Sequence, residues 1–187
     1  MMYELFPMKK NGFTLIELVV VIVILGILAV VAAPKFMNLQ NDARNASLKG
    51  LEGSLKSALG ITYSKLTTMG LENAQYVTTQ AHYDGAGPGI YGVHIPLPGC
   101  NKSPWCTFRY GYPDAHVNSL KNLITNFSND WGIGYDEKTG KYSITFKQFL
   151  GKSAKGWSIV TRDDCRIIYD LPKSAGESYK LTFIPCK

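Results

Sequence analysis

The chain has 187 residues, of which 45% are hydrophobic, and it carries a formal charge of +6. Its basic residues are spread along the chain rather than clustered with aromatic residues, so nucleic-acid binding is at most a weak function. The sequence shows no internal repeat and no low-complexity tract, which excludes a repeat array.

The first predicted element is a short leader over residues 1–12, which ends in Lys9, Lys10, Asn11 and Gly12. Met1 and Met8 are both compatible with the translation start, because either leaves the two lysines in place. Lysines on the N-terminal side of an apolar run keep that end in the cytoplasm by the positive-inside tendency. We therefore expect the residues after Ala33 on the far side of the membrane.

Residues 13–33 form an apolar run in which Glu17 is the one charged side chain. As a helix this run is roughly 32 Å long, close to the ~30 Å hydrocarbon core of a bilayer. A cleaved secretory signal fits poorly, because the run is too long and no small-x-small cleavage site follows it. A plain signal anchor leaves Glu17 unexplained, since a charge there costs about 2.5 kcal/mol or more.

The residues around this junction resemble the N-terminus of a type IV prepilin. The resemblance lies in Lys9-Lys10-x-Gly12, then Phe13-Thr14-Leu15-Ile16-Glu17-Leu18, then an apolar helix and Pro34. It implies that a membrane-embedded prepilin peptidase cuts between Gly12 and Phe13 and then N-methylates Phe13. Gly12 suits such a site because a residue without Cβ lets a protease approach the backbone closely. The segment 34–44 is similar to the one in mannose-sensitive haemagglutinin pilins.

The resemblance gives Glu17 a role in assembly. Cleavage would free an α-amine on Phe13, which is cationic near neutral pH because such amines titrate at about 7.7–8.0. In a fibre, the amine of one subunit would meet Glu17 of a neighbour inside an apolar bundle. Such a pair sets register more than it adds net stability. The alternative is that Glu17, about one turn from the end of the span, snorkels to water.

The helix is expected to continue to residue 69. Apolar residues at spacings of three and four define one stripe, made of Leu48, Leu51, Leu55, Leu59, Tyr63 and Leu66. The second half of the helix is therefore amphipathic, and a globular head is expected to pack on it. Pro34 predicts a kink, and Gly26 is a second weak point. Both are assigned to assembly, because local bending between them would make a fibre extensible.

Residues 70–187 are expected to form the head. The overall fold class is α+β: a long helix, half transmembrane and half amphipathic, packed against an antiparallel sheet, as in the type IV pilin fold. A short amphipathic helix is predicted from Val117, Leu120, Ile124 and Phe127. Strands are predicted at residues 131–135, 142–146, 157–161, 165–171 and 179–186, with 136–140 as a hairpin loop.

Four cysteines, Cys100, Cys106, Cys165 and Cys186, lie in the predicted exported part, where disulfides are the default. They allow three connectivities. An antiparallel register that places Cys165 opposite Cys186 and Ile167 opposite Ile184 favours Cys165–Cys186, with Cys100–Cys106 closing a small loop. By resemblance, residues 165–186 then form the C-terminal disulfide region of a pilin. A metal site is not expected, because no CxxC or zinc spacing is present.

No catalytic constellation is found, so neither an enzyme nor a cofactor is expected. His82, His94 and His116 are scattered along the chain. The carboxylate pairs at 136–137 and 163–164 fall in predicted turns. Calcium binding at Asp136 is conceivable, but a solvated hairpin tip is the favoured interpretation.

These features predict the major subunit of a type IV pilus that mediates surface attachment. Its partners would be copies of itself, the prepilin peptidase and methyltransferase, the inner-membrane assembly machinery and a carbohydrate on a host or other surface. The precursor is expected in the inner membrane with a periplasmic head, and the assembled subunit in an extracellular fimbrium. The alternatives are a type II secretion pseudopilin and a minor pilin that acts as tip adhesin or DNA receptor.

Overall fold

The computed structural model describes residues 12–80, 90–100, 105–115 and 117–187. The chain divides into two compact units, Met1–Asn41 and Asp42–Lys187. Apart from Gly12, the predicted leader lies outside the described residues, as do His82 and His116.

One helix, α1, runs from Leu15 to Thr68. It passes through Pro34 without a break, so proline does not end the helix there. Gly70, at φ 67°, closes its C-terminus in a Schellman motif, since the N–H of Gly70 donates to Thr67 and that of Leu71 donates to Leu66. The helix therefore ends within one residue of position 69.

In the first unit, α1 carries apolar side chains on every face, and these are exposed. Within the described residues, its hydropathy and length suffice for one crossing of a membrane. Such a surface is unfavourable in water at about 25 cal/mol per Å² of apolar area, so lipid or other apolar helices must cover it.

The second unit holds the remaining elements. Its helices are α2 (Val117–Leu123), α3 (Phe127–Asp130) and the 3₁₀ turn η1 (Lys147–Phe149). The larger sheet, in the order β10-β9-β6-β5-β8-β7, contains β5 (Trp131–Asp136), β6 (Lys141–Phe146), β7 (Leu150–Lys152), β8 (Ser158–Val160), β9 (Arg166–Asp170) and β10 (Lys180–Ile184). The smaller sheet, in the order β2-β1-β3-β4, contains β1 (Tyr76–Thr78), β2 (Ile90–Gly92), β3 (Thr107–Arg109) and β4 (Tyr112–Pro113).

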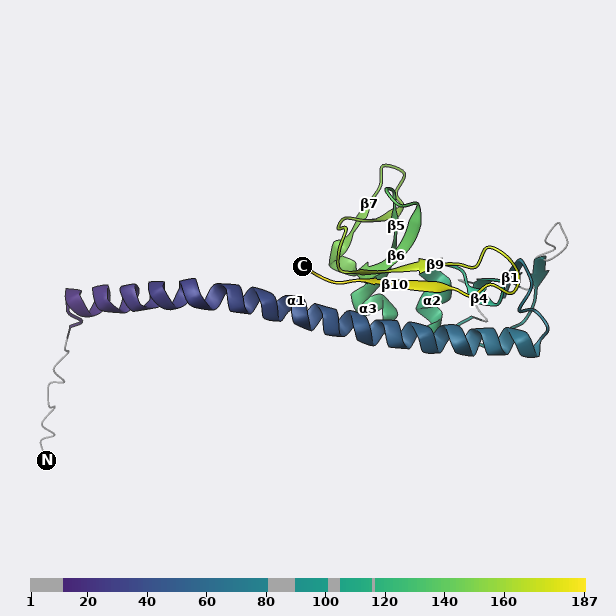
Figure 1. The fold of residues 1–187 in the computed structure, drawn as a ribbon, viewed down its shortest axis with the longest axis horizontal. Coiled ribbons are helices and arrows are strands. Elements are labelled where there is room, and N and C mark those ends of the chain that lie inside the picture. The colour runs from purple at the N-terminus through teal and green to yellow at the C-terminus, as the bar shows by residue number, and fades with distance from the viewer. Residues whose placement is uncertain (1–11, 81–89, 101–104, 116) are drawn as a thin grey trace, which may run out of the picture. The chain divides into compact units, whose positions relative to one another are not determined.

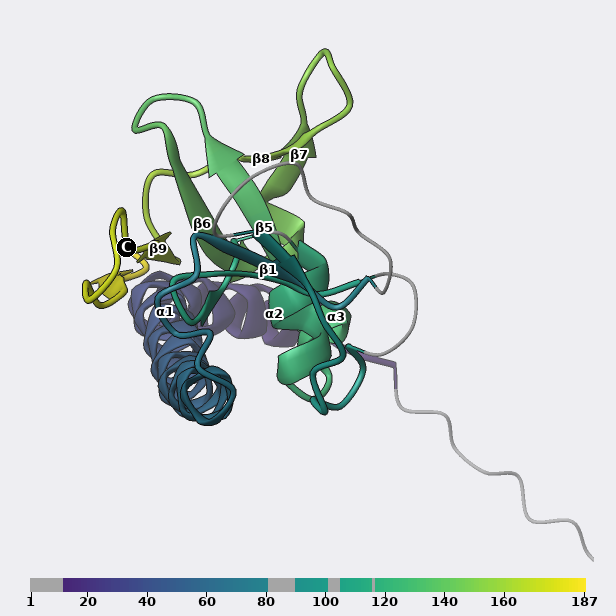
Figure 2. The same ribbon diagram turned by 90° about the vertical axis from the view of Figure 1, so that its right-hand side faces the viewer.

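The leucine stripe of α1 forms one side of the head's core. All five leucines of the stripe are buried. The first four, with Tyr63, belong to the core under the larger sheet, and Leu66 packs in a second cluster with Val77 and Phe108 of the smaller sheet. Strands β9 and β10 run along the second half of α1 (Figure 1). Figure 2 shows α2 and α3 beside α1, and the core joins their Leu120 and Phe127 to Ile144 and Ile167 of the larger sheet. The predicted α+β architecture is confirmed.

The sequence predicts an antiparallel sheet, but each of the two sheets contains a parallel pair of strands. Strand β5 pairs with β8 in parallel, and β1 pairs with β2 in parallel. Two glycines make the first pairing possible, because a Cβ on Gly132 or Gly134 would lie 2.5 or 2.7 Å from a methyl group of Leu150. Leu150 of β7 fills the space over these two glycines of β5. The β7–β8 hairpin is closed by three antiparallel residue pairs, and its strand β8 runs along the edge of β5.

Two disulfides are present, Cys100–Cys106 and Cys165–Cys186. The expected strand register is wrong by one residue, because Ile167 pairs with Phe183 and the ladder ends at Arg166 opposite Ile184. The reason is that Cys165 adopts φ 60°, outside the strand conformation, and donates its N–H to the carbonyl of Pro185. The disulfide therefore closes just beyond the ladder.

Removing the Cys165–Cys186 bridge should lower the free energy of unfolding by about 3 kcal/mol, against about 2 kcal/mol for Cys100–Cys106. The difference follows from sequence separations of 21 and 6 residues. Paired Cys→Ser variants of each bridge, compared by urea unfolding of the full chain, measure both losses. A larger loss from the shorter loop would contradict the expectation.

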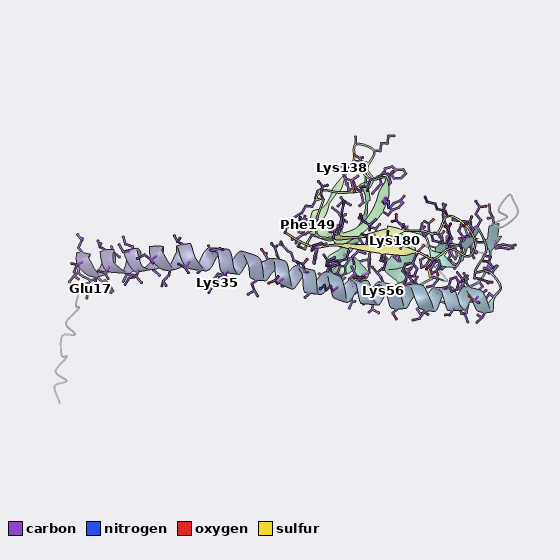
Figure 3. All side chains as sticks on the ribbon, in the orientation of Figure 1. Glu17, Lys35, Lys56, Lys138, Phe149 and Lys180 are labelled. Atoms are coloured by element: carbon purple, nitrogen blue, oxygen red, sulfur yellow. A yellow bond between two sulfur atoms is a disulfide. The ribbon has the colours of Figure 1, made fainter. Side chains whose placement is uncertain are left out.

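The C-terminus is held on α1 by Asn45. Its side-chain oxygen accepts the Cys186 N–H at 2.7 Å, and its amide donates to the Cys186 carbonyl at 3.3 Å. Nearby, the guanidinium groups of Arg44 and Arg162 lie over the ring of Phe149, at 5.4 and 4.7 Å from its centroid. Phe149 is labelled in Figure 3. One contact holds the C-terminal residues on the helix and the other holds η1 there, so together they position the disulfide region.

Candidate functional site

The junction predicted for cleavage lies immediately before α1. Gly12, Phe13 and Thr14 have no regular secondary structure, and Leu15 begins the helix. The side chain of Phe13 is 83% exposed, and nothing lies within 4 Å of a Cβ built on Gly12. An uncrowded backbone without regular secondary structure is open to a protease. Cleavage and methylation at this position remain a proposal.

The structure adds a residue that the sequence reasoning missed, Thr14. The Glu17 carboxylate accepts the Thr14 N–H at 2.8 Å and the Thr14 hydroxyl at 2.6 Å, while the Glu17 N–H donates to that hydroxyl at 3.4 Å. This reciprocal pair is a capping box, and its Thr-x-x-Glu spacing is readable in the sequence. The Glu17 carboxylate therefore satisfies one backbone donor at the start of its own helix, the Thr14 N–H, and the Thr14 hydroxyl satisfies a second, the Glu17 N–H.

A negative charge in the first turn also suits the positive end of the helix dipole. The carboxylate has acceptor capacity beyond its bonds to Thr14, because an ionised carboxylate offers about four lone-pair sites. Glu17 can thus keep its cap and still accept a cation from outside.

The remaining assembly residues lie farther along the same helix. Gly26 has no atom within 4 Å of a built Cβ, and Pro34 lies roughly 26 Å beyond Glu17 at ~1.5 Å per residue. Phe13 and Glu17 line one shallow hollow at the start of this exposed apolar helix, and Gly26 and Pro34 lie farther along it, outside the hollow. Such an arrangement can pack against other apolar helices.

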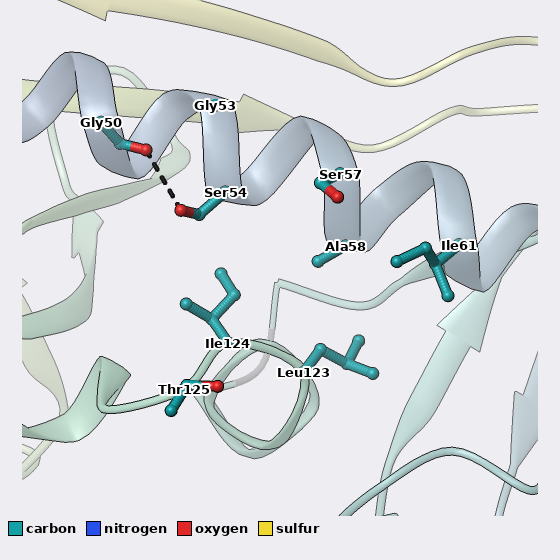
Figure 4. A pocket seen from close by; sticks show the side chains of 9 residues that line it. All are labelled: Gly50, Gly53, Ser54, Ser57, Ala58, Ile61, Leu123, Ile124 and Thr125. Atoms are coloured by element: carbon teal, nitrogen blue, oxygen red, sulfur yellow. Dashed lines mark hydrogen bonds between the residues drawn. The ribbon is translucent and has the colours of Figure 1, made fainter.

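A second feature lies on α1 within the head. Small residues line a groove between α1 and the end of α2, as Figure 4 shows, and its full lining is Gly50, Gly53, Ser54, Ser57, Ala58, Ile61, Leu123, Ile124 and Thr125. The Ser54 hydroxyl donates to the Gly50 carbonyl at 3.2 Å, as serine often does inside a helix. A Cβ at Gly50 or Gly53 would meet nothing within 4 Å, so the head's own packing does not require either glycine.

We expect Gly53→Ala to raise the free energy of unfolding by about 1 kcal/mol, because glycine inside a helix is less favourable than alanine by that amount. Gly70→Ala is the matched control. Its φ of 67° makes alanine strained there, and we expect a loss of about 1 kcal/mol. Urea unfolding of the two variants measures both effects. A loss of stability in Gly53→Ala would show that this helical glycine is needed.

The expectation that Asp136 is a solvated hairpin tip is wrong. Its carboxylate is buried at the end of β5 and contacts Arg166 of β9, with Oδ2 and Nη1 2.7 Å apart. The Thr139 hydroxyl and the Lys138 N–H also donate to it. Three protein donors thus bind this buried carboxylate, so the residue is structural.

Burial of Asp136 alone would raise the pKa of its carboxyl. Hydrogen bonds from the Thr139 hydroxyl and the Lys138 N–H, together with the ion pair to Arg166, outweigh burial and lower that pKa. Across the described residues, no three His, Cys, Asp or Glu side chains are placed to hold a metal ion.

Comparison with known proteins agrees with the N-terminal features. Residues 7–33 match the family model of the prokaryotic N-terminal methylation motif. The chain is 44% identical over 54 residues to the type IV narrow pilus major component PilA5 of Thermus thermophilus, a match that covers 29% of this chain and 47% of that protein.

It is also 39% identical over 72 residues to the type II secretion system core protein G of Pseudomonas aeruginosa, over 38% of this chain and 46% of that protein. The chain thus spans about half the length of the curated relatives it matches. No solved structure matches it significantly. The matched motif and both relatives support the type IV pilin family in its broad sense, which includes pseudopilins.

Proposed function

We propose that this chain, a pilin-type subunit by its methylation motif, its relatives and its α+β fold, is the major subunit of a type IV pilus. The observation that carries the proposal is the sequence Gly12-Phe13 with Glu17 four residues later, at the start of an exposed apolar helix. The motif and this helix fit an inner-membrane precursor and an extracellular pilus.

In this mechanism the prepilin peptidase removes residues 1–12 and methylates the new amine of Phe13. The membrane holds the apolar helix until the assembly machinery transfers the subunit to the base of the fibre. There the helices of neighbouring subunits replace lipid around residues 13–33. The cationic amine of one subunit pairs with Glu17 of the next, which sets the axial register because an unpaired charge in that bundle is costly.

We further propose the mannose-sensitive haemagglutinin type, with surface attachment as its role. The segment from Pro34 to Arg44 supports that subtype by resemblance. The two disulfides and the head of residues 70–187 favour an extracellular fibre exposed to oxidising conditions.

A type II secretion pseudopilin is the second candidate, and the similarity to core protein G favours it. Shearing cells and measuring this chain in the released fibres separates the two. We expect the chain to be the most abundant protein of the sheared fraction. Its presence in trace amounts only, with the rest in the membrane, would contradict a major pilus subunit.

A further inference from the structure

An exposed tryptophan stands over a small hollow at one edge of the larger sheet. Trp157 lies in the loop between β7 and β8, and its side chain is 63% exposed. The hollow beside it has a volume of about 200 Å³ and is lined by Tyr135, Glu137, Ser153, Lys155, Trp157 and Ile159. Large exposed aromatic side chains next to a concavity are typical of binding sites.

The loop fixes the position of the tryptophan. The N–H of Ser153 donates to the Trp157 carbonyl at 2.9 Å, and the N–H of Trp157 donates to the Ser153 hydroxyl at 3.2 Å. Gly156, at φ 80°, makes the turn between them and donates to the Ser153 carbonyl. The backbone of Trp157 is therefore held in a closed turn, and less backbone entropy is lost when a ligand binds to this loop.

The opposite wall comes from the end of β5. The ring of Tyr135 stands edge-on to Tyr142 at 5.5 Å, which fixes its plane. Ile159 of β8 lies beside Tyr135 because the two residues are partners in the parallel pair. Two aromatic rings and one aliphatic side chain thus form the apolar part of the hollow.

The rim is polar and its charges cancel. Glu137 contributes a carboxylate and Lys155 an ammonium, and neither makes an ion pair or hydrogen bond within the described part of the chain. The neighbouring Lys138, at the tip of the β5–β6 hairpin in Figure 3, is in contrast already paired, with its Nζ 2.8 Å from Oδ2 of Asp163. The hollow therefore offers free donors and acceptors without net charge.

We propose that this hollow binds one ring of a neutral saccharide. A pyranose has an apolar C–H face that can stack on the Trp157 indole, and hydroxyls that can bond to Glu137, Lys155 and the Tyr135 hydroxyl. The Glu137 carboxylate repels an anionic ligand, and the Lys155 ammonium repels a cationic one such as a quaternary amine. A neutral polyol therefore suits the site best. Its volume is below the ~300 Å³ of sites for drug-sized ligands, which limits it to a single ring.

This inference rests on the attachment role proposed above and assigns that role to particular residues. The test uses the full chain in a detergent without a sugar headgroup, first on an array of neutral and acidic glycans and then by isothermal titration calorimetry with the neutral oligosaccharides retained. Trp157→Ala should weaken their binding by about tenfold or more, with an unchanged melting temperature. Tyr91→Ala, another exposed aromatic outside the hollow, is the matched control and should bind normally.

Binding to neutral glycans that requires Trp157 supports the proposal. Unchanged binding by Trp157→Ala overturns it, as does the absence of any neutral glycan from those retained by the native chain. A Trp157→Ala variant that binds glycans normally but yields fewer fibres would make the hollow a contact between subunits and also overturns it. Failure of the glycan assay leaves polymerisation untouched, because fibre yield is measured separately.

Discussion

Replacing Glu17 by alanine is expected to abolish fibre assembly while leaving the subunit in the membrane. Insertion should persist because the substitution removes the one charge of an apolar span. Assembly should fail because the Phe13 amine of a neighbour would be buried without its partner, at a cost of about 3–5 kcal/mol per contact. Immunoblots of the sheared and membrane fractions measure both quantities.

The capping box calls for a second variant, Glu17→Gln. Glutamine can still accept the Thr14 N–H, as glutamate does at 2.8 Å, but it carries no charge. If the ion pair sets the register, Glu17→Gln should lose fibres as completely as Glu17→Ala. Normal fibres from Glu17→Gln would assign Glu17 to helix capping and would refute the register mechanism.

The second large effect is expected in the head, at the buried ion pair. Asp136→Ala should lower the free energy of unfolding by about 3–5 kcal/mol, because it leaves the Arg166 guanidinium buried and unpaired. Asp163→Ala is the matched control, since its pair with Lys138 is exposed and should contribute about 0–1 kcal/mol. Urea unfolding at neutral pH compares the two, and equal losses would contradict the account.

The ion pair between Asp136 and Arg166 also predicts that the free energy of unfolding depends on pH. The pKa of Asp136 is lowered in the folded chain, so the unfolded chain binds the proton more tightly. Its contribution to stability is complete above the unfolded value of about 3.9 and is lost as the pH falls below it. Asp136→Asn should flatten the part of the stability profile below about pH 4 that is due to this group. A profile as steep as that of the native chain would be the contrary result.

Local patterns predicted much of this architecture. The stripe from Leu48 to Leu66 and the hairpin at residues 136–140 depend on periodicity and turn chemistry within a short segment, and both are present. The Gly12-Phe13 junction with Glu17 is local as well. The capping residue Thr14 was readable at the same spacing but was overlooked.

Contacts between residues far apart in the chain could not be predicted from the sequence. The pairing of Asp136 with Arg166 joins residues 30 apart, and it exists only because β6 aligns β5 with β9. The hollow at Trp157 requires the parallel pairing of β5 with β8, which no short pattern predicts. The register error at Cys165 has a local cause, since one residue at positive φ ends the ladder early.

The central claim is that the chain is processed at Gly12 and polymerises through the helix that follows. Mass spectrometry of the N-terminal peptide from sheared fibres tests it most directly. We predict that the fibre subunit begins at Phe13 and carries one methyl group on its α-amine. A fibre subunit that retains residues before Phe13, or the absence of this chain from the fibres, would contradict the claim.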